Sequence, residues 1–202
     1  MERNEVNMAI MGKHGVSTTT PENVLLGAGT VHKNLKWDAS SKKWTGEVIG
    51  ATSGGNKLAI AGEIVNIELD GALVPVKGLA VKQGGTASIE VNFAELNAEV
   101  IQRASLFEVG ESDAEGYAMF KDKAEITEGD YVENFAFVGK TANGKKDIII
   151  IFENALCTSG LELEGKNKEN SVVKLTMEAY ANIDGDLDTL PVKIYYPTEI
   201  VA

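Results

Sequence analysis

Residues 48–78, VIGATSGGNKLAIAGEIVNIELDGALVPVKG, are the stretch that most constrains how this chain can fold. Gly54, Gly55 and Asn56 lie between two apolar runs. Glycine and asparagine tolerate the positive φ that a tight turn requires. The stretch therefore predicts a long β-hairpin over residues 48–70, with its turn at these three residues.

The second half of this predicted hairpin reverses its pattern of polarity. Up to Ile64 the apolar residues alternate on one parity, and from Val65 onward they alternate on the other. Such a reversal predicts a bulge or a bend, or burial of the two faces by different neighbours. The run then enters a turn-rich loop over residues 70–78. A small monomeric domain rarely needs so long a ribbon, whereas an assembly module often does.

The glycine content favours a β architecture. The chain has 202 residues, with 21 glycines against 4 prolines, which suits turn-rich strands better than a helical bundle. Hydrophobic residues make up 44% of the chain, enough to form a core. We expect a mainly β protein, a β-sandwich or open barrel, with residues 23–202 as one domain. Residues 1–22 are polar and aperiodic, and they predict an arm that orders only against a partner.

Three segments in the middle of the chain show strand patterns. Residues 86–93 give the cleanest alternation. Their apolar face carries Ala87, Ile89, Val91 and Phe93. Residues 148–152 are continuously apolar, which predicts a central strand buried on both faces. Between them, residues 131–141 alternate and are followed by Asn143 and Gly144, the strongest two-residue hairpin signal.

Helical periodicity occurs once, over residues 93–106, where apolar residues recur at three- and four-residue steps. Asn92 is the residue that we expect to cap this flanking helix. Residues 171–181 alternate again, and residues 184–197 predict a turn followed by a short terminal strand or arm. The polar and basic segment 32–45 predicts an insertion or loop.

The charge balance limits the function. The chain has 19 basic and 30 acidic residues, a formal net charge of −11, which argues against binding of the nucleic-acid backbone as its main activity. No run of about 18 apolar residues is present, so we expect no membrane partner. Cys157 is the only cysteine, so no intrachain disulfide is possible. We expect no cofactor and no resident metal.

Two patterns imitate ligand loops, and each fits a turn better. Residues 139–141, Gly-Lys-Thr, resemble the end of a phosphate-binding loop, but Asn134 stands where that motif needs a glycine. Asp184, Asp186 and Asp188 imitate the start of a calcium loop. That loop's glycine and glutamate are absent, and we expect a surface turn.

No catalytic set emerges from the remaining residues. The glycines at 27 and 29 lack the third glycine of a dinucleotide fingerprint, because His32 occupies its place. One cysteine and two histidines, His14 and His32, cannot supply a structural zinc site. A nucleophilic pair of Cys157 and His32 stays open, although an inert core thiol fits better. We expect that the protein is not an enzyme.

Four segments in order resemble the tail tube (major tail) proteins of siphophages, the bacteriophages with long non-contractile tails. They are PENVLLGAG at residues 21–29, GATSGG at 50–55, DGA at 70–72 with PVKG at 75–78, and DLDTLPVKIYYP at 186–197. Together they span nearly the whole chain. One departure is the basic, tryptophan-containing segment 33–43, which is longer than the family pattern.

The resemblance implies a β-sandwich with a flanking helix, similar to the type VI secretion tube protein. It implies hexameric rings that stack into a hollow tube, through which double-stranded DNA passes without specific binding. Its partners would be further copies of the chain, the tape measure protein and the tail-terminator and tail-tip proteins. The tube would be assembled in the host bacterial cytoplasm and would reside in the virion.

On this resemblance the turn-rich loop is an inter-ring loop, and it would bridge to an adjacent ring together with residues 1–22. The residues of the inter-ring loop are Asp70, Gly71, Ala72, Pro75, Lys77 and Gly78. Acids on the hairpin would line the lumen and repel DNA phosphates. Glu63, Glu68 and Asp70 are the candidates, with solvated outer charges as the alternative role.

Two rival functions remain on the sequence. The tube of a contractile tail or tailocin would share the fold and also contact a sheath. A β-sandwich binding or virion decoration module would need exposed aromatic platforms, for which Trp37 and Trp44 are the candidates.

Overall fold

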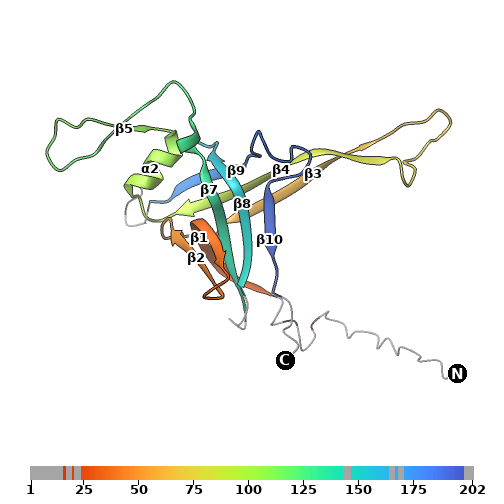
Figure 1. Ribbon diagram of the computed structural model, residues 1–202, viewed down its shortest axis with the longest axis horizontal. Coiled ribbons are helices and arrows are strands. Elements are labelled where there is room, and N and C mark those ends of the chain that lie inside the picture. The colour runs from red at the N-terminus through yellow and green to blue at the C-terminus, as the bar shows by residue number, and fades with distance from the viewer. Residues whose placement is uncertain are drawn as a thin grey trace.

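The computed structural model describes residues 24–142, 147–163 and 171–197, together with Val16, Thr20 and Asn167. Over these residues the chain is mainly β, as the sequence predicts, with a large antiparallel sheet and one α-helix beside it (Figure 1). The helices are α2 (Ala98–Ser105) and the 3-10 helix η1 (Glu128–Asp130). The strands are β1 (Leu25–Asp38), β2 (Lys43–Val48), β3 (Lys57–Asn66), β4 (Ala80–Phe93), β5 (Glu108–Gly110), β6 (Met119–Lys121), β7 (Val132–Thr141), β8 (Asp147–Cys157), β9 (Val173–Ala179) and β10 (Val192–Tyr195).

The main sheet has the strand order β2-β1-β7-β8-β9-β4-β3, with β10 also paired to β8. β8 pairs with β10 through residues 149–152 and with β9 through residues 155–157, so β9 and β10 share one of its edges. β5 and β6 form a separate two-stranded sheet. β10 confirms the predicted terminal strand.

Residues 49–53 connect the two ends of the main sheet. The backbone N–H of Ile49 donates to the carbonyl of Val31 at 3.1 Å, and that of Ser53 donates to the carbonyl of Asn92 at 2.9 Å. The connection therefore reaches from β1 to β4. Because the ends of the sheet are brought together in this way, the sheet curls around a core as an open barrel does.

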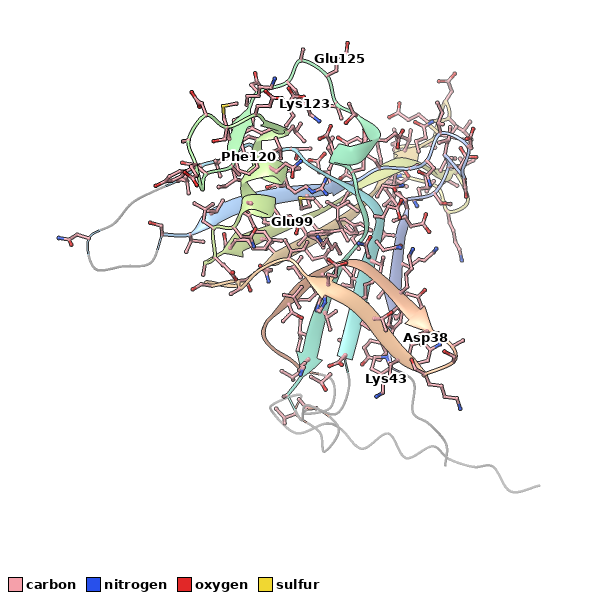
Figure 2. The ribbon with its side chains drawn as sticks, turned by 60° about the vertical axis from the view of Figure 1, so that its left-hand side comes forward. Asp38, Lys43, Glu99, Phe120, Lys123 and Glu125 are labelled. Carbon is pink, nitrogen blue, oxygen red and sulfur yellow. The ribbon has the colours of Figure 1, made fainter. Side chains whose placement is uncertain are left out.

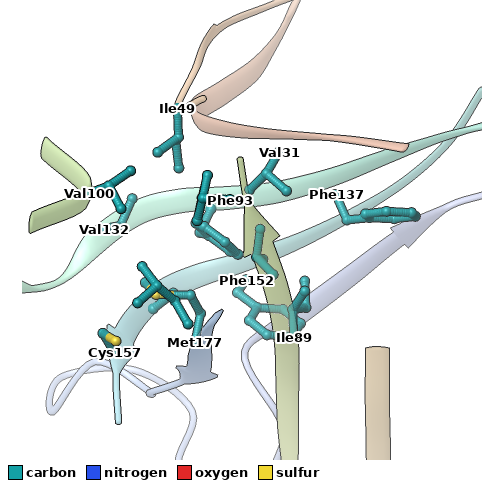
Figure 3. Close-up of a cluster of buried hydrophobic side chains, with 14 of the residues drawn as sticks. Val31, Ile49, Ile89, Phe93, Val100, Val132, Phe137, Phe152, Cys157 and Met177 are labelled. Carbon is teal, nitrogen blue, oxygen red and sulfur yellow. The ribbon is translucent and has the colours of Figure 1, made fainter. Parts of the chain in front are cut away.

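The main core lies inside the curled sheet, where side chains of β1, β4, β7, β8, β9 and α2 meet (Figure 3). Its largest fully buried members include Phe93, Phe135, Phe152, Ile89 and Leu175. The alternation predicted for residues 86–93 is confirmed, and that predicted for residues 171–181 is confirmed over β9, because the apolar face of each strand is the buried one. Ala181, predicted on the same face as β9, lies beyond that strand and is exposed. Removal of this apolar surface from water is the main favourable term of folding.

β8 is the central strand that the apolar run predicts. Ile150 and Phe152 point into the main core, whereas Ile149 and Ile151 belong to a second buried cluster on the other face of the sheet. That second cluster also contains Leu35, against which Trp44 packs. Both faces of β8 are therefore covered, as predicted.

The predicted helix is present but shorter than residues 93–106. Phe93 is the last residue of β4 and is buried in the core, so it belongs to the strand. Asn97, and not Asn92, caps the helix: its side-chain oxygen accepts the backbone N–H of Val100 at 2.9 Å. Val100 and Ala104 face the core, as the periodicity predicts. The helix ends at Leu106, whose φ of 54° is left-handed.

The prediction of a hairpin over residues 48–70 is wrong about which strands pair. β3 does not pair with the strand before it, because residues 49–56 cross to the other end of the sheet, and β3 pairs with β4 instead. The hairpin is thus β3–β4, and its connection is the loop 67–79. Gly54 and Gly55 do adopt positive φ, but the segment is tied to β4 and is not a hairpin turn. Its anchor is Asn92, whose amide donates to the carbonyl of Gly55 at 2.7 Å.

The segment 32–45 is also not a loop. β1 continues to Asp38 and returns as β2, so that Trp37 lies opposite Trp44 in an antiparallel pair. The two tryptophans stabilise this hairpin through the contact of their rings, an interaction that the polar composition of the segment does not suggest.

The reversal of polarity near Ile64 corresponds to a bulge, one of the predicted outcomes. Gly62 lies opposite Gly85 and Ile64 opposite Lys82, so β4 has one more residue than β3 over this step. Gly85 has a φ of 152°, and a Cβ there would lie 2.4 Å from the carbonyl oxygen of Ala61. The bulge therefore requires glycine at this position.

The predicted hairpin between β7 and β8 is confirmed by their antiparallel pairing, in which Lys140 lies opposite Asp147. The turn residues themselves, Asn143 and Gly144, lie outside the described residues. The same is true of the predicted arm over residues 1–22, apart from Val16 and Thr20.

Candidate assembly surfaces

The outer part of the β3–β4 hairpin, residues 60–86, projects away from the body of the protein and is called the arm here (Figure 1). It carries many exposed aliphatic side chains. They are Ile60, Ile64, Val65, Ile67, Leu69, Leu73, Val74, Val76 and Val81. Leu73 is 99% exposed and Val74 is 72% exposed. So many exposed aliphatic groups on one ribbon make it a candidate interaction surface, because soluble monomers rarely leave large apolar patches in water.

The tip of the arm, residues 67–79, is held by its own backbone hydrogen bonds. The N–H of Ala72 donates to the carbonyl of Leu69 at 3.1 Å, and the N–H of Ile67 donates to the carbonyl of Leu79 at 2.9 Å. Gly71 occupies the third position of the first turn with a φ of 89°, as that turn demands. The tip is therefore preorganised to present its aliphatic residues.

The structure brings the predicted inter-ring residues together at this tip. Asp70, Gly71, Ala72, Pro75, Lys77 and Gly78 all lie in the loop 67–79 and are all exposed. Glu68 lies in the same loop. Glu63, the third predicted lumen acid, lies on β3 at the bulge, away from the tip. Gly54, Gly55 and Asn56 are not part of this surface.

The main sheet has two strands at the ends of its order, β2 and β3. Among the described residues, each pairs along one side only, β2 with β1 and β3 with β4. The outer edge of β3 thus carries backbone N–H and C=O groups with no partner strand in the described chain. A free edge of this kind is a template for a strand of another copy.

A second candidate surface is a groove of about 460 Å³ between the β1–β2 hairpin and β10, called the aromatic groove here. Trp37, Trp44, Asp147, Ile149, Tyr195, Tyr196 and Pro197 line it. The rings of Trp37 and Trp44 are 5.5 Å apart between centroids, and those of Trp44 and Tyr195 are 4.7 Å apart, both edge to face. Trp37 is 51% exposed, so the groove offers aromatic surface to a partner.

The β1–β2 turn beside this groove is basic. Lys42 and Lys43 lie in or next to the turn and are exposed, and no ion pair of the described chain involves them. The acid of this turn, Asp38 (labelled with Lys43 in Figure 2), already has partners, because its carboxylate accepts the hydroxyls of Ser40 and Ser41, each at 2.6 Å. These hydrogen bonds lower the pKa of Asp38 to about 2, so it stays ionised.

Sequence reasoning singled out the tryptophans but missed Tyr195 as their neighbour. Tyr195 reaches them because β10 pairs with β8 and places Tyr195 opposite Ile149. One local signal was available: Trp37 and Trp44 are placed symmetrically about the Ser40–Ser41 step, as partners in a short hairpin would be.

The most acidic stretch, residues 108–133, is fastened by a largely buried ion pair between Lys123 and Asp130. Asp130 also accepts the backbone N–H of Thr127 at 2.7 Å. Burial alone would raise the pKa of Asp130, but the bonds from Lys123 and Thr127 outweigh it and lower that pKa. Arg103 of α2 donates to the carbonyl of Gly129 at 2.5 Å, which attaches the stretch to the helix.

The residues considered for catalysis do not meet. The thiol of Cys157 is buried and lies 3.7 Å from the carbonyl of Ala104, whereas His32 forms its hydrogen bond with Thr30 at 2.9 Å. Burial lowers the pKa of His32. No nucleophile–base pair is formed by Cys157 and His32.

The calcium-like and phosphate-like patterns are both structural. Asp186 accepts the N–H of Asp188 at 2.9 Å and the hydroxyl of Thr189 at 2.7 Å, which closes a turn. Residues 139–141 are the end of β7. Within the described ranges, no group of three His, Cys, Asp or Glu side chains could hold a metal ion. No helix of the described chain is long and apolar enough to cross a membrane.

No protein-family model matches the chain, and a search of curated proteins gives no significant match.

Proposed function

We propose that the chain is a structural subunit of a bacteriophage tail tube of the siphophage type, which assembles with copies of itself into stacked hexameric rings. The observation that carries this proposal is the arm, with its row of exposed aliphatic residues ending at Leu73 and Val74. An isolated subunit leaves this surface in water, whereas an assembly buries it.

The free edges of the main sheet support closure of a ring. β3 and β2 stand at opposite ends of the strand order, and each leaves one edge open in the described chain. Pairing between the edges of neighbouring copies satisfies their backbone groups and leaves no edge once the ring is complete. Pairing of this kind gives a continuous β wall around a lumen.

The acidic composition supports passage of DNA without retention. With a formal net charge of −11, the protein lacks the excess of positive charge that binds phosphates. Acids of the hairpin, Glu63 first among them, would line the lumen in this proposal, and they would repel the sugar-phosphate backbone within about one Debye length. The role is structural, in the virion, with the tape measure, tail-terminator and tail-tip proteins as further partners.

Negative-stain electron microscopy of the purified protein over a range of concentrations tests the proposal. We expect rings or hollow tubes, and a sedimentation coefficient that rises with concentration. A monomer at every concentration would contradict the proposal. If such a monomer bound glycans and lost them on Trp37→Ala, a decoration or binding module would replace it.

A further inference from the structure

We infer that the arm tip of one copy docks into the aromatic groove of the next copy along the tube. The inference rests on the proposed function and names the receiving surface for the exposed tip. The occupant of the groove is the loop 67–79 of a second copy of this chain.

The first argument is complementary polarity. The tip presents Leu73, which is almost fully exposed, and Val74, which is mostly exposed, on a loop fixed by its backbone hydrogen bonds. The groove presents rings of Trp37 and Tyr195 that are about half-exposed. Aliphatic side chains on aromatic faces bury large apolar areas at small entropic cost when both parts are preorganised.

The second argument is complementary charge. The chain as a whole is strongly acidic, yet the β1–β2 turn beside the groove holds Lys36, Lys42 and Lys43 against Asp38, and the groove itself is lined by one acid, Asp147. The tip holds the acids Glu68 and Asp70 against Lys77 alone. Opposite charges at the rim of an apolar contact select the partner and its register. The acidic tip therefore fits this turn better than it fits the mostly acidic remainder of the chain.

The third argument is placement. The arm leaves the upper part of the body, whereas the β1–β2 turn lies on its lower side in both views (Figures 1 and 2), with Asp38 and Lys43 labelled in Figure 2. A tip that binds the groove of another copy leaves its own groove open for a third copy. A head-to-tail contact whose rotation does not close into a ring generates an open stack, as a tube requires.

The inference also divides the predicted lumen acids. Glu68 and Asp70 would face the basic turn of the neighbouring copy, so only Glu63, on β3 at the bulge, would be left for the lumen.

Two substitutions test the apolar part of the contact, each with a matched control. Leu73→Ser and Trp37→Ala should stop stacking while rings still form. Leu187→Ser and Tyr117→Ala change an exposed leucine and an exposed aromatic residue that lie in neither surface, and they should stack as the wild type does. Electron microscopy and sedimentation give the readout, and circular dichroism confirms that each variant is folded.

Charge reversal tests the rim. Glu68→Lys with Asp70→Lys should raise the protein concentration needed for stacking about tenfold or more, the scale of a modest loss in contact energy. Adding Lys42→Glu and Lys43→Glu to the same chain should restore stacking. Rescue of this kind is not expected from variants that are merely unstable.

Disulfide cross-linking tests the geometry. Cys157 is buried, so Asp70→Cys in one preparation and Lys42→Cys in another give one accessible thiol each. Oxidation of the mixed assembly should link the two variants, whereas Asp70→Cys with Ser112→Cys should not link.

The outcomes separate the two proposals. If Trp37→Ala still formed tubes like those of the wild type, and Asp70→Cys did not cross-link to Lys42→Cys, the inference would be overturned and the tube function would still stand. Glycan binding lost in Trp37→Ala, with normal stacking, would overturn it as well. A wild-type protein that never leaves the monomeric state would overturn the tube function itself.

Discussion

Lys33 donates hydrogen bonds from its ammonium group to both carboxylate oxygens of Glu99, at 2.7 and 2.8 Å, although 66 positions separate the two residues. The pair joins β1 to α2, and the carboxylate of Glu47 lies 3.3 Å from the same ammonium group. The bond with Glu99 raises the pKa of Lys33 against the partial burial that lowers it. The helix is thus fixed to the hairpin that carries the aromatic groove.

The first prediction concerns this pair. A double-mutant cycle of Lys33→Met and Glu99→Gln should give a coupling free energy of about 0.5–1 kcal/mol, because both side chains remain partly in water. Urea unfolding measures it. Lys36→Met is a suitable control because Lys36 is exposed on the same strand. A coupling near zero would show that the helix is held by its other contacts, such as the packing of Val100 and Ala104, and not by this ion pair.

The second prediction concerns Lys123 and Asp130. Asp130→Asn should lower the free energy of unfolding by about 2–4 kcal/mol at pH 7, because it leaves a mostly buried ammonium group unpaired. Asp113→Asn, in the same acidic stretch but exposed, is the control.

The pH dependence of this effect has a fixed sign. The pKa of Asp130 is lowered in the folded state, so its contribution is complete above the unfolded-state pKa of about 3.9. The contribution is lost as the pH falls through the lower folded-state pKa. The wild type and Asp130→Asn should therefore converge in stability at acid pH, and a constant difference down to pH 2 would contradict this account.

The third prediction concerns Asp38. Its carboxyl group should titrate with a pKa of about 2 by carbon-detected NMR. Ser40→Ala with Ser41→Ala should raise that pKa toward the ordinary value, since it removes both hydroxyl donors. Asp113, an exposed aspartate elsewhere, serves as the reference in the same spectra. An unchanged pKa in the double variant would assign the shift to other groups.

The fourth prediction concerns the bulge of the arm. Gly85→Ala places a methyl group against the carbonyl of Ala61 and should destabilise the arm by about 1–3 kcal/mol. Hydrogen exchange should accelerate at residues of β3 beyond Gly62 and remain slow in β8. Gly129→Ala is the control, because its nearest neighbour would lie 3.9 Å away. Equal exchange in the two variants would argue against a strained bulge.

The fifth prediction concerns the lumen. Glu63→Lys should leave tubes intact but slow genome ejection, because phosphates would be attracted to the wall. Ejection kinetics of particles carrying the variant measure this effect. Lys77→Glu, which adds an acid elsewhere on the arm, is the comparison. Normal ejection and infectivity in Glu63→Lys would assign Glu63 to an outer surface.

The sequence predicts most accurately the elements whose periodicity is enforced by the core. Ile89 and Phe93 alternate because one face of β4 packs inside the barrel, and Ile149 to Phe152 are uniformly apolar because β8 has clusters on both faces. The start of the helix was harder to place. Phe93 fits the helical spacing by coincidence, while its burial in the strand decides its conformation.

Strand pairing was the part that local patterns could not supply. Gly54 and Gly55 have the positive φ of turn residues, but the same conformation serves a segment that crosses from β2 to β3. Register across the sheet depends on contacts between residues far apart in the chain. The aromatic groove depends on the same kind of contact, since Tyr195 meets Trp44 through the pairing of β10 with β8.

The β3–β4 ribbon also acts as a ruler. Its two strands are paired up to Asn66 and Ala80, so the distance from the body to the tip is set by the number of residue pairs. A strand rises about 3.3 Å per residue, so two residues added to each strand beyond the bulge would move the tip outward by about 7 Å and keep every side chain on its face. If the tip binds a neighbouring copy, the length of this one hairpin determines the axial repeat of the assembly.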